Sequence, residues 1–186
     1  MNFIQYNRSK EHDVILVQWY GQMMMDGEFY ATFYKSMESL STFLDWFCPP
    51  RSLFFKIEFN GSKETPCPLA CAWFEPIMSA AGIGYWVRKD RRKSKLAVSS
   101  AEEAISIALK NVPSLITFTQ RKELIKAHQR FGYNIAGFFP GLWDGKDVWA
   151  FTIDQFGFDH RKMRSALNPH ATSISPAIDA IIQAET

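Results

Sequence analysis

The sequence has no long apolar run, few cysteines and almost no excess of charge. No stretch of about 18 apolar residues occurs, so we expect no membrane-spanning helix. The first residues lack the apolar stretch of a signal peptide. Three cysteines in 186 residues are too few for a secreted disulfide scaffold. A formal net charge of +2 gives no general attraction to nucleic acid or anionic lipid. These absences predict a cytoplasmic protein.

Aromatic side chains are abundant instead. They make up 15% of a chain whose 47% hydrophobic and 22% charged residues are otherwise ordinary for a globular protein. The length suits one domain over residues 1–154, followed by an appendage over 155–186. That appendage contains Asn168-Pro169 and Ser175-Pro176 but few aromatics. We expect at most one short helix in it, over 176–184.

The apolar periodicity predicts elements in the order βααβββαβαββ. The expected strands cover 2–7, 52–59, 69–74, 83–87, 115–118, 135–139 and 148–153, and the expected helices 9–26, 33–47, 99–109 and 122–131. Ser99, with the acidic pair Glu102 and Glu103 behind it, is typical of a capping box that opens a helix. Asp144-Gly145 predicts a hairpin turn. The order favours an α/β fold of the α+β kind, a mixed sheet with helices on its faces.

The element order and the stretch 127–133 resemble the GNAT superfamily of N-acetyltransferases. In that family a helix after the fifth strand ends in a pattern like Ala-x-x-x-Tyr-x-x-x-Gly-Phe. Gly132-Tyr133 corresponds to the final Gly-Phe, and Asp144-Gly145 falls where the last hairpin turns. The resemblance covers about residues 57–153. It implies the GNAT-like acyl-CoA N-acyltransferase fold.

The resemblance also implies a reaction and its donor: transfer of an acetyl group from acetyl-CoA to an amine, on a small molecule or a protein. In the family the fourth and fifth strands splay apart around the pantetheine arm. A turn and helix N-terminus after the fourth strand hold the pyrophosphate. The corresponding backbone here belongs to Tyr85, Trp86 and Val87. The pyrophosphate would lie against Arg91, Arg92, Lys93, Ser94, Lys95, Leu96, Ala97, Ser99 and Ser100.

The turn departs from the family pattern Arg/Gln-x-x-Gly-x-Gly/Ala. It corresponds to Arg92 through Ala97, and Lys95 stands where the central glycine is usual. A glycine there permits positive φ and close approach of a ligand, so phosphate binding would depend on the basic run 88–95. A solvated loop is an equally simple interpretation of that run. Nucleic-acid binding is the least favoured, because adjacent aromatics belong to a predicted strand.

Three residues are candidates for proton transfer. His128 occupies the position at which many family members have tyrosine, and a histidine could protonate the leaving thiolate. A hydrogen-bonded surface histidine is the simpler alternative. Glu58 and Glu75, on the second and third strands, are candidates for the base. An ion pair between Glu58 and Lys56 and a solvated strand end at Glu75 are the alternatives, and water could accept the proton instead.

No metal site is expected, because Cys67 and Cys71 lack a second pair and the four histidines are scattered. A second function stays open: a GNAT-fold protein that has lost catalysis and acts as a structural or assembly factor. Degenerate copies of this fold occur in some tailed bacteriophages. The missing glycine and tyrosine fit this alternative, and the appendage would then contact a protein partner in the host cytoplasm or the virion.

Overall fold

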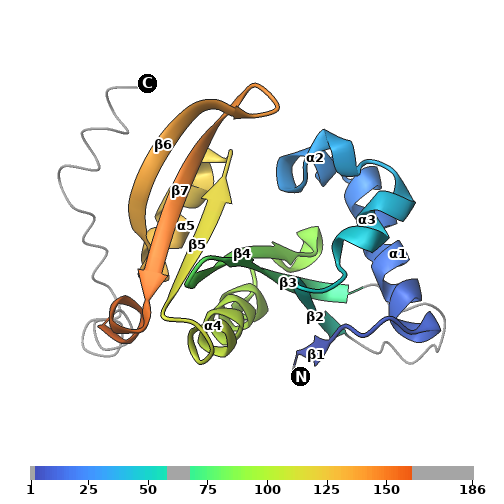
Figure 1. The fold of residues 1–186 in the computed structure, drawn as a ribbon, viewed down its shortest axis with the longest axis horizontal. Helices are drawn as coiled ribbons and strands as arrows, with labels where there is room; N and C mark the ends of the chain where they lie inside the picture. Colours follow the sequence, from blue (N-terminus) through green and yellow to red (C-terminus); the bar gives the residue numbers. More distant parts are fainter. Residues whose placement is uncertain (1–2, 58–67, 161–186) are drawn as a thin grey trace.

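One sheet of seven strands organises the chain, in the order β1-β2-β3-β4-β5-β7-β6 (Figure 1). The computed structural model describes residues 3–57 and 68–160. All neighbouring strands are antiparallel except β4 and β5, which are parallel. The strands are β1 (Ile4–Gln5), β2 (Ser52–Ile57), β3 (Pro68–Ile77), β4 (Ala80–Val87), β5 (Ser114–Thr119), β6 (Asn134–Trp143) and β7 (Lys146–Asp154).

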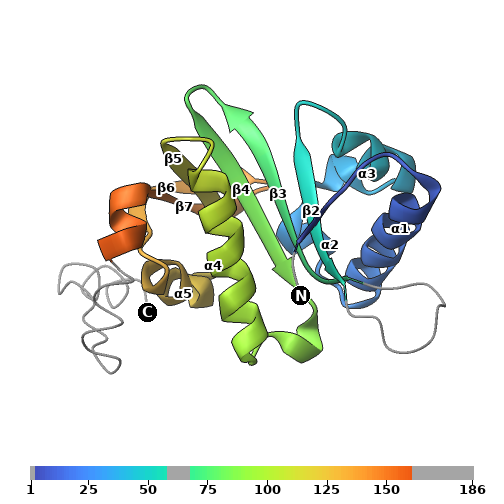
Figure 2. The same cartoon turned by 90° about the horizontal axis from the view of Figure 1, so that it is seen from below.

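The helices lie on both faces of the sheet (Figures 1 and 2). Those before the central strands are α1 (Lys10–Met25), α2 (Phe29–Thr32), the short 3-10 helix η1 (Lys35–Met37) and α3 (Leu40–Trp46). The later ones are η2 (Lys89–Arg91), α4 (Lys95–Leu109), η3 (Lys122–Leu124) and α5 (Ile125–Arg130). The predicted mixed α/β arrangement is confirmed.

Alternate residues of the central strands point into two separate cores. On β3, Cys71 and Trp73 belong to the core under α1–α3, whereas Ala72 belongs to the core under α4 and α5. On β4, Trp86 faces the first core and Ile83 the second. The alternation is what a strand covered on both faces requires, because successive side chains point in opposite directions.

The helix predicted over 33–47 is divided. Phe33 has an extended backbone (φ −128°, ψ 160°) that ends α2, and Ser39 starts α3 by accepting a hydrogen bond from the Thr42 amide. Even so, Phe33, Met37 and Phe47 are buried, as their spacing indicated. The periodicity thus identified the residues of the core but not the breaks between short helices.

One predicted helix end and one predicted hairpin turn are confirmed. Gly132 has φ +91° and follows the end of α5, a conformation that glycine adopts without strain. Asp144 and Gly145 both have positive φ and connect β6 to β7. Of the predicted appendage, residues 155–160 are described and helical, and Phe158 is buried in the core under α4 and α5. The helix predicted over 176–184 lies outside the described residues.

Candidate functional site

The parallel strands β4 and β5 separate soon after they begin. They are paired only at Ala81 with Leu115 and Gly82 with Ile116, although β4 continues to Val87 and β5 to Thr119. Beyond this pairing, the edge of β4 that faces β5 has no partner strand in the described part of the chain. Figure 1 shows the two strands diverging. The backbone groups along this edge can therefore pair with an extended ligand.

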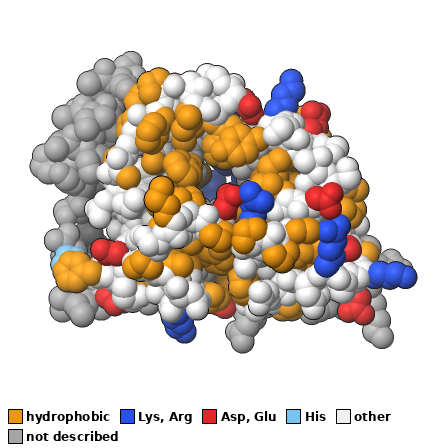
Figure 3. Space-filling view, in the orientation of Figure 1, with side chains coloured by type: hydrophobic (Ala, Val, Ile, Leu, Met, Phe, Trp, Pro, Cys, Tyr) orange, Lys and Arg blue, Asp and Glu red, His pale blue; other side chains and the backbone are white. Residues whose placement is uncertain are grey.

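The surface is hollowed over the place where β4 and β5 diverge. Figure 3 shows the hollow near the middle of this face, with hydrophobic side chains gathered around it and charged side chains of both signs at its edge. The tip of the β6–β7 hairpin extends toward the α2 side of the molecule (Figure 1). There the rings of Tyr34 and Trp143 stack with centroids 4.6 Å apart, and the Lys35 amide donates to Asp144 Oδ2 at 3.1 Å. These contacts join the two sides of the hollow.

The turn from β4 into α4 contains the residues predicted to hold pyrophosphate. We call residues 88–94 the β4–α4 turn. Helix α4 begins at Lys95, with the extended residue Ser94 before it, so Ser99 and Ser100 are not the cap that the sequence suggested. Ser99 is exposed in the helix and Ser100 is buried. The predicted helix start was wrong because Lys95 to Val98 continue the helix toward its N-terminus.

The start of α4 leaves backbone donors and lysines free. Ser94 makes no side-chain cap, since its hydroxyl donates to the Arg91 carbonyl at 2.6 Å. The first N–H groups of a helix lack partners within it. In α4 the Ala97 amide donates to the Ser94 carbonyl at 3.1 Å, whereas the amides of Lys95 and Leu96 have no such bond within the described ranges. In the described chain, Lys89, Lys93 and Lys95 have no ion-pair partner, and Lys93 and Lys95 are exposed. Charge and helix N–H groups together suit an anion.

Lys95 has no unusual backbone conformation. Among the described residues, the non-glycine residues with positive φ are Met78 and Asp144. The glycine of the family pattern is therefore not needed here for a left-handed turn. What Lys95 changes is the side chain that it places at the start of α4.

Arg92 is tied to a residue that the sequence analysis did not identify. Both terminal nitrogens of its guanidinium donate to the carboxylate of Glu28, which lies between α1 and α2. The Arg92 Nε donates to the Val87 carbonyl at 2.9 Å, and the Trp86 indole donates to Glu28 Oε2 at 3.2 Å. One carboxylate thus joins the α1–α2 connection, the end of β4 and the β4–α4 turn.

The charge state of Glu28 follows from this network. Burial alone would raise the pKa of the Glu28 carboxyl, but the hydrogen bonds and positive charge of Arg92 outweigh it, so the pKa lies below its usual range. Arg121, just after β5, adds to the effect. Glu28 is therefore a carboxylate at neutral pH and is already paired. Its only signal in the sequence was its place after the helix break at Asp26-Gly27.

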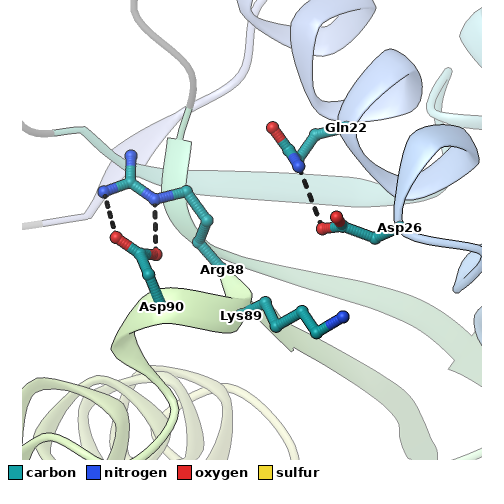
Figure 4. A pocket seen from close by; sticks show the side chains of 5 residues that line it. All are labelled: Gln22, Asp26, Arg88, Lys89 and Asp90. Carbon is teal, nitrogen blue, oxygen red and sulfur yellow. Dashed lines mark hydrogen bonds and ion pairs between the residues drawn. The ribbon is translucent and has the colours of Figure 1, made fainter.

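A depression of about 440 Å³ lies on the α1 side of the β4–α4 turn. It is lined by Gln22, Asp26, Arg88, Lys89 and Asp90 (Figure 4). Gln22 donates to Asp26 at 2.9 Å, and Arg88 makes two hydrogen bonds to Asp90. The Lys89 side chain extends toward α1 (Figure 4). The side chains that line the depression are therefore all polar or charged, with charges of both signs.

His128 packs against the sheet from α5. Its ring stacks on Phe151 of β7 with centroids 4.6 Å apart, and its Nδ1–H donates to the Leu124 carbonyl at 2.8 Å. Burial lowers the pKa of His128, although the hydrogen bond to Leu124 opposes the shift. The ring is therefore neutral near pH 7, with its proton on Nδ1. In that form Nε2 is an acceptor, and the ring can donate from Nε2 only when it is protonated.

Of the two predicted base candidates, Glu75 lies beside the paired part of β4 and β5, and Glu58 lies outside the described residues. Glu75 is opposite Gly82, next to the part of β4 that is still paired with β5. Arg51 donates to Glu75 Oε1 from Nε and Nη2, at 3.0 and 2.6 Å, so Glu75 is not merely a solvated strand end. Glu58 and Cys67 lie outside the described residues. Lys56 forms its ion pair with Glu103 of α4, at 2.5 Å.

The described residues contain no group of three or more histidine, cysteine or acidic side chains arranged to hold a metal ion. Over the same ranges, no helix has the length and apolar character needed to cross a bilayer.

No protein-family model and no curated protein sequence matches this chain. Solved structures share its fold. A structure described as a putative phosphinothricin N-acetyltransferase has 17% identity and a TM-score of 0.61, over 82% of this chain and 98% of its own. An N-acetyltransferase from Staphylococcus aureus Mu50 has 18% identity and a TM-score of 0.60, over 83% and 99%.

A spermidine N-acetyltransferase from Vibrio cholerae, in complex with CoA and spermine, has 10% identity and a TM-score of 0.62, over 84% of this chain and 96% of its own. At such low identities the likeness establishes the fold alone. The predicted fold is confirmed.

Proposed function

We propose that this chain, which has the GNAT fold, transfers an acetyl group from acetyl-CoA to an amine. The observation that carries the proposal is the early separation of β4 and β5, beside the N-terminus of α4. An unpaired strand edge, free helix N–H groups and unpaired lysines come together at one end of β4. This is the combination that an acyl-pantetheine with a pyrophosphate needs.

The residues present fit such a donor. The backbone of Tyr85 and the amide of Val87 would pair with the amides of the pantetheine arm, whereas the Val87 carbonyl is already bonded to Arg92. The Arg88 amide donates to the Leu69 carbonyl, and the alternation along β4 therefore turns the backbone groups of Trp86 toward Cys71 of β3.

The backbone N–H groups of Lys95 and Leu96 and the exposed side chains of Lys93 and Lys95 would hold the pyrophosphate. Arg91, Leu96 and Ala97 shape the surroundings, and Ala97 accepts a hydrogen bond from the Tyr85 hydroxyl at 3.1 Å. Tyr85 thereby links β4 to the start of α4.

Proton transfer would be divided between His128 and water. When bound, acetyl-CoA supplies a thioester carbonyl that an uncharged amine attacks directly. The protonated His128 ring would offer the Nε2 proton to the departing thiolate, a role favoured below its lowered pKa. Glu75 is held by Arg51 beside the closed part of the strands, so we assign loss of the amine proton to water.

The acceptor is proposed only as an amine, on a small molecule or a protein. One structure of similar fold is a spermidine N-acetyltransferase, so polyamines belong in a first panel of acceptors. The mixed charges at the edge of the hollow would admit a cationic amine (Figure 3).

Thermal unfolding with and without acetyl-CoA tests the proposal. A ligand at about 100 times its dissociation constant stabilises the native state by roughly 2.7 kcal/mol. For a chain of this size we expect a rise in Tm of about 5–11 °C. Free CoA should give a similar shift, whereas ATP at equal concentration controls for unspecific phosphate binding.

No shift with millimolar acetyl-CoA would contradict the proposal. It would favour the alternative of a GNAT-fold structural or assembly protein, with a protein partner at residues 155–186. A shift with acetyl-CoA and CoA, absent with ATP, would justify turnover assays with the amine panel.

A further inference from the structure

We propose that Glu28 is a positioning residue for the coenzyme: through Arg92 it holds the β4–α4 turn in the shape that presents the start of α4. This inference rests on the proposed function, because it concerns the pyrophosphate end of the same site. It assigns to Arg92 a role different from direct contact with phosphate.

The hydrogen-bonding groups of the Arg92 side chain are all used within the protein. Each of the three guanidinium nitrogens of Arg92 makes a hydrogen bond, two of them to Glu28 and one to the Val87 carbonyl. The side chains are partly buried, with 28% of Arg92 and 13% of Glu28 exposed. Breaking such a pair to free Arg92 for a phosphate would leave a buried carboxylate without its partner. Lys93 and Lys95, which are unpaired and exposed, are better placed to meet the anion.

The turn has no glycine to define its path. No glycine occurs between Gly84 and Gly132, so the backbone from Val87 into α4 uses ordinary conformations. The bond from Arg92 Nε to the Val87 carbonyl closes this turn across five residues. Glu28 holds the same guanidinium from the other side. Side-chain hydrogen bonds thus fix the path of this turn, which a tight glycine turn would fix through its backbone conformation.

The link also ties the turn to the helices that cover the other face. Glu28 immediately precedes α2, and the Trp86 indole that donates to it belongs to the core under α1–α3. The position of α4 relative to that core is therefore set in part by one carboxylate. Loss of its charge should loosen the turn while the packed core remains.

A double-mutant cycle tests the proposal: Glu28→Gln, Arg92→Gln and the two together, each titrated with acetyl-CoA by calorimetry. We expect each single variant to raise Kd about tenfold, the effect of losing hydrogen bonds to a charged group. The double variant should bind no more weakly than Arg92→Gln alone, because both changes remove the same link.

Two further readouts separate positioning from general destabilisation. Glu103→Gln breaks another partly buried ion pair, with Lys56, and should lower stability without changing Kd. Hydrogen exchange of the ligand-free protein should be faster at the amides of 88–97 in Glu28→Gln, and unchanged there in Glu103→Gln. In Glu28→Gln, the KM for acetyl-CoA should rise more than the KM for S-acetyl-N-acetylcysteamine, a thioester donor without the nucleotide.

The possible results are distinct. Suppose that the wild type binds acetyl-CoA and that Glu28→Gln binds it as tightly as the wild type, or more tightly. That result overturns the inference and leaves the proposed function intact. Tighter binding would mean that Glu28 competes with phosphate for Arg92. If the wild type does not bind acetyl-CoA, the proposed function fails, and unchanged exchange at 88–97 in Glu28→Gln would then overturn the inference as well.

Discussion

The two faces of the sheet are packed in different ways. The core under α1–α3 consists largely of aromatic rings, with Trp19 at its centre. Its ring centroid lies 5.5–5.9 Å from those of Phe33, Phe43, Phe47, Trp73 and Trp86. The core under α4 and α5 instead uses small residues where α4 meets the sheet: Ala72, Ala81, Ala104 and Ala108.

This difference between the two cores explains the position of the candidate site. Large interlocking rings make one side a stable framework, because each buries a large area. Alanines on the other side let α4 approach the strands closely, which brings its N-terminus to the end of β4. The candidate site lies where the two cores meet.

The largest expected effect is on the aromatic core. Trp19→Ala should lower the free energy of unfolding by about 3–5 kcal/mol, since it leaves a cavity among close-packed rings. Trp19 has no exposed surface, whereas Val17 on the same helix is 38% exposed. Urea unfolding of Trp19→Ala beside Val17→Ala measures the contrast. Similar small losses in both variants would show that the aromatic side is not the framework.

An intermediate effect is expected where α4 meets the sheet. Ala104→Leu adds three carbon atoms at a position that is 1% exposed, and overpacking of this kind costs about 1–3 kcal/mol. Val98→Leu enlarges an exposed side chain of the same helix and should be nearly neutral. Equal stability of the two variants, measured by thermal unfolding, would contradict close approach of α4.

The smallest expected effect appears only at acidic pH. Because the pKa of His128 is lowered in the folded protein, the unfolded chain binds more protons below pH 6.5, the usual histidine value. The stability of the wild type should therefore decline as the pH falls from about 6.5 through the lowered pKa. His128→Phe keeps a ring over Phe151 but cannot titrate, so this part of the decline should disappear.

Urea unfolding of wild type and His128→Phe at pH 7.5 and 5.5 measures the difference. Identical pH dependence in the two proteins would show that the ring titrates as it does in the unfolded chain.

Much of the fold could be predicted because its signals are local. The alternation of apolar and polar residues along 52–57 indicated a strand, and one face of that strand lies in the aromatic core. Asp144-Gly145 indicated a hairpin, and both residues have positive φ in its turn. Helix boundaries were less accessible. Ser99 resembled a cap because its own neighbours fit the pattern, yet the helix continues past it to Lys95.

The site could be predicted only in part. The position of the motif indicated residues 91–97, which lie in the β4–α4 turn and the first residues of α4. Their binding of a pyrophosphate stays a prediction. Glu28 could not be found in this way, because 64 residues separate it from Arg92. The catalytic roles of His128, Glu58 and Glu75 stay predictions.

The sequence by itself determined which residues are apolar, where the chain turns and in which order its strands and helices occur, because these depend on neighbours a few residues apart. Only the tertiary structure decided at which residues β4 and β5 separate, that Arg92 bonds to Glu28 and that Glu75 bonds to Arg51. Such pairings depend on which distant side chains share a buried space, and a buried charge takes whichever partner the packing brings to it.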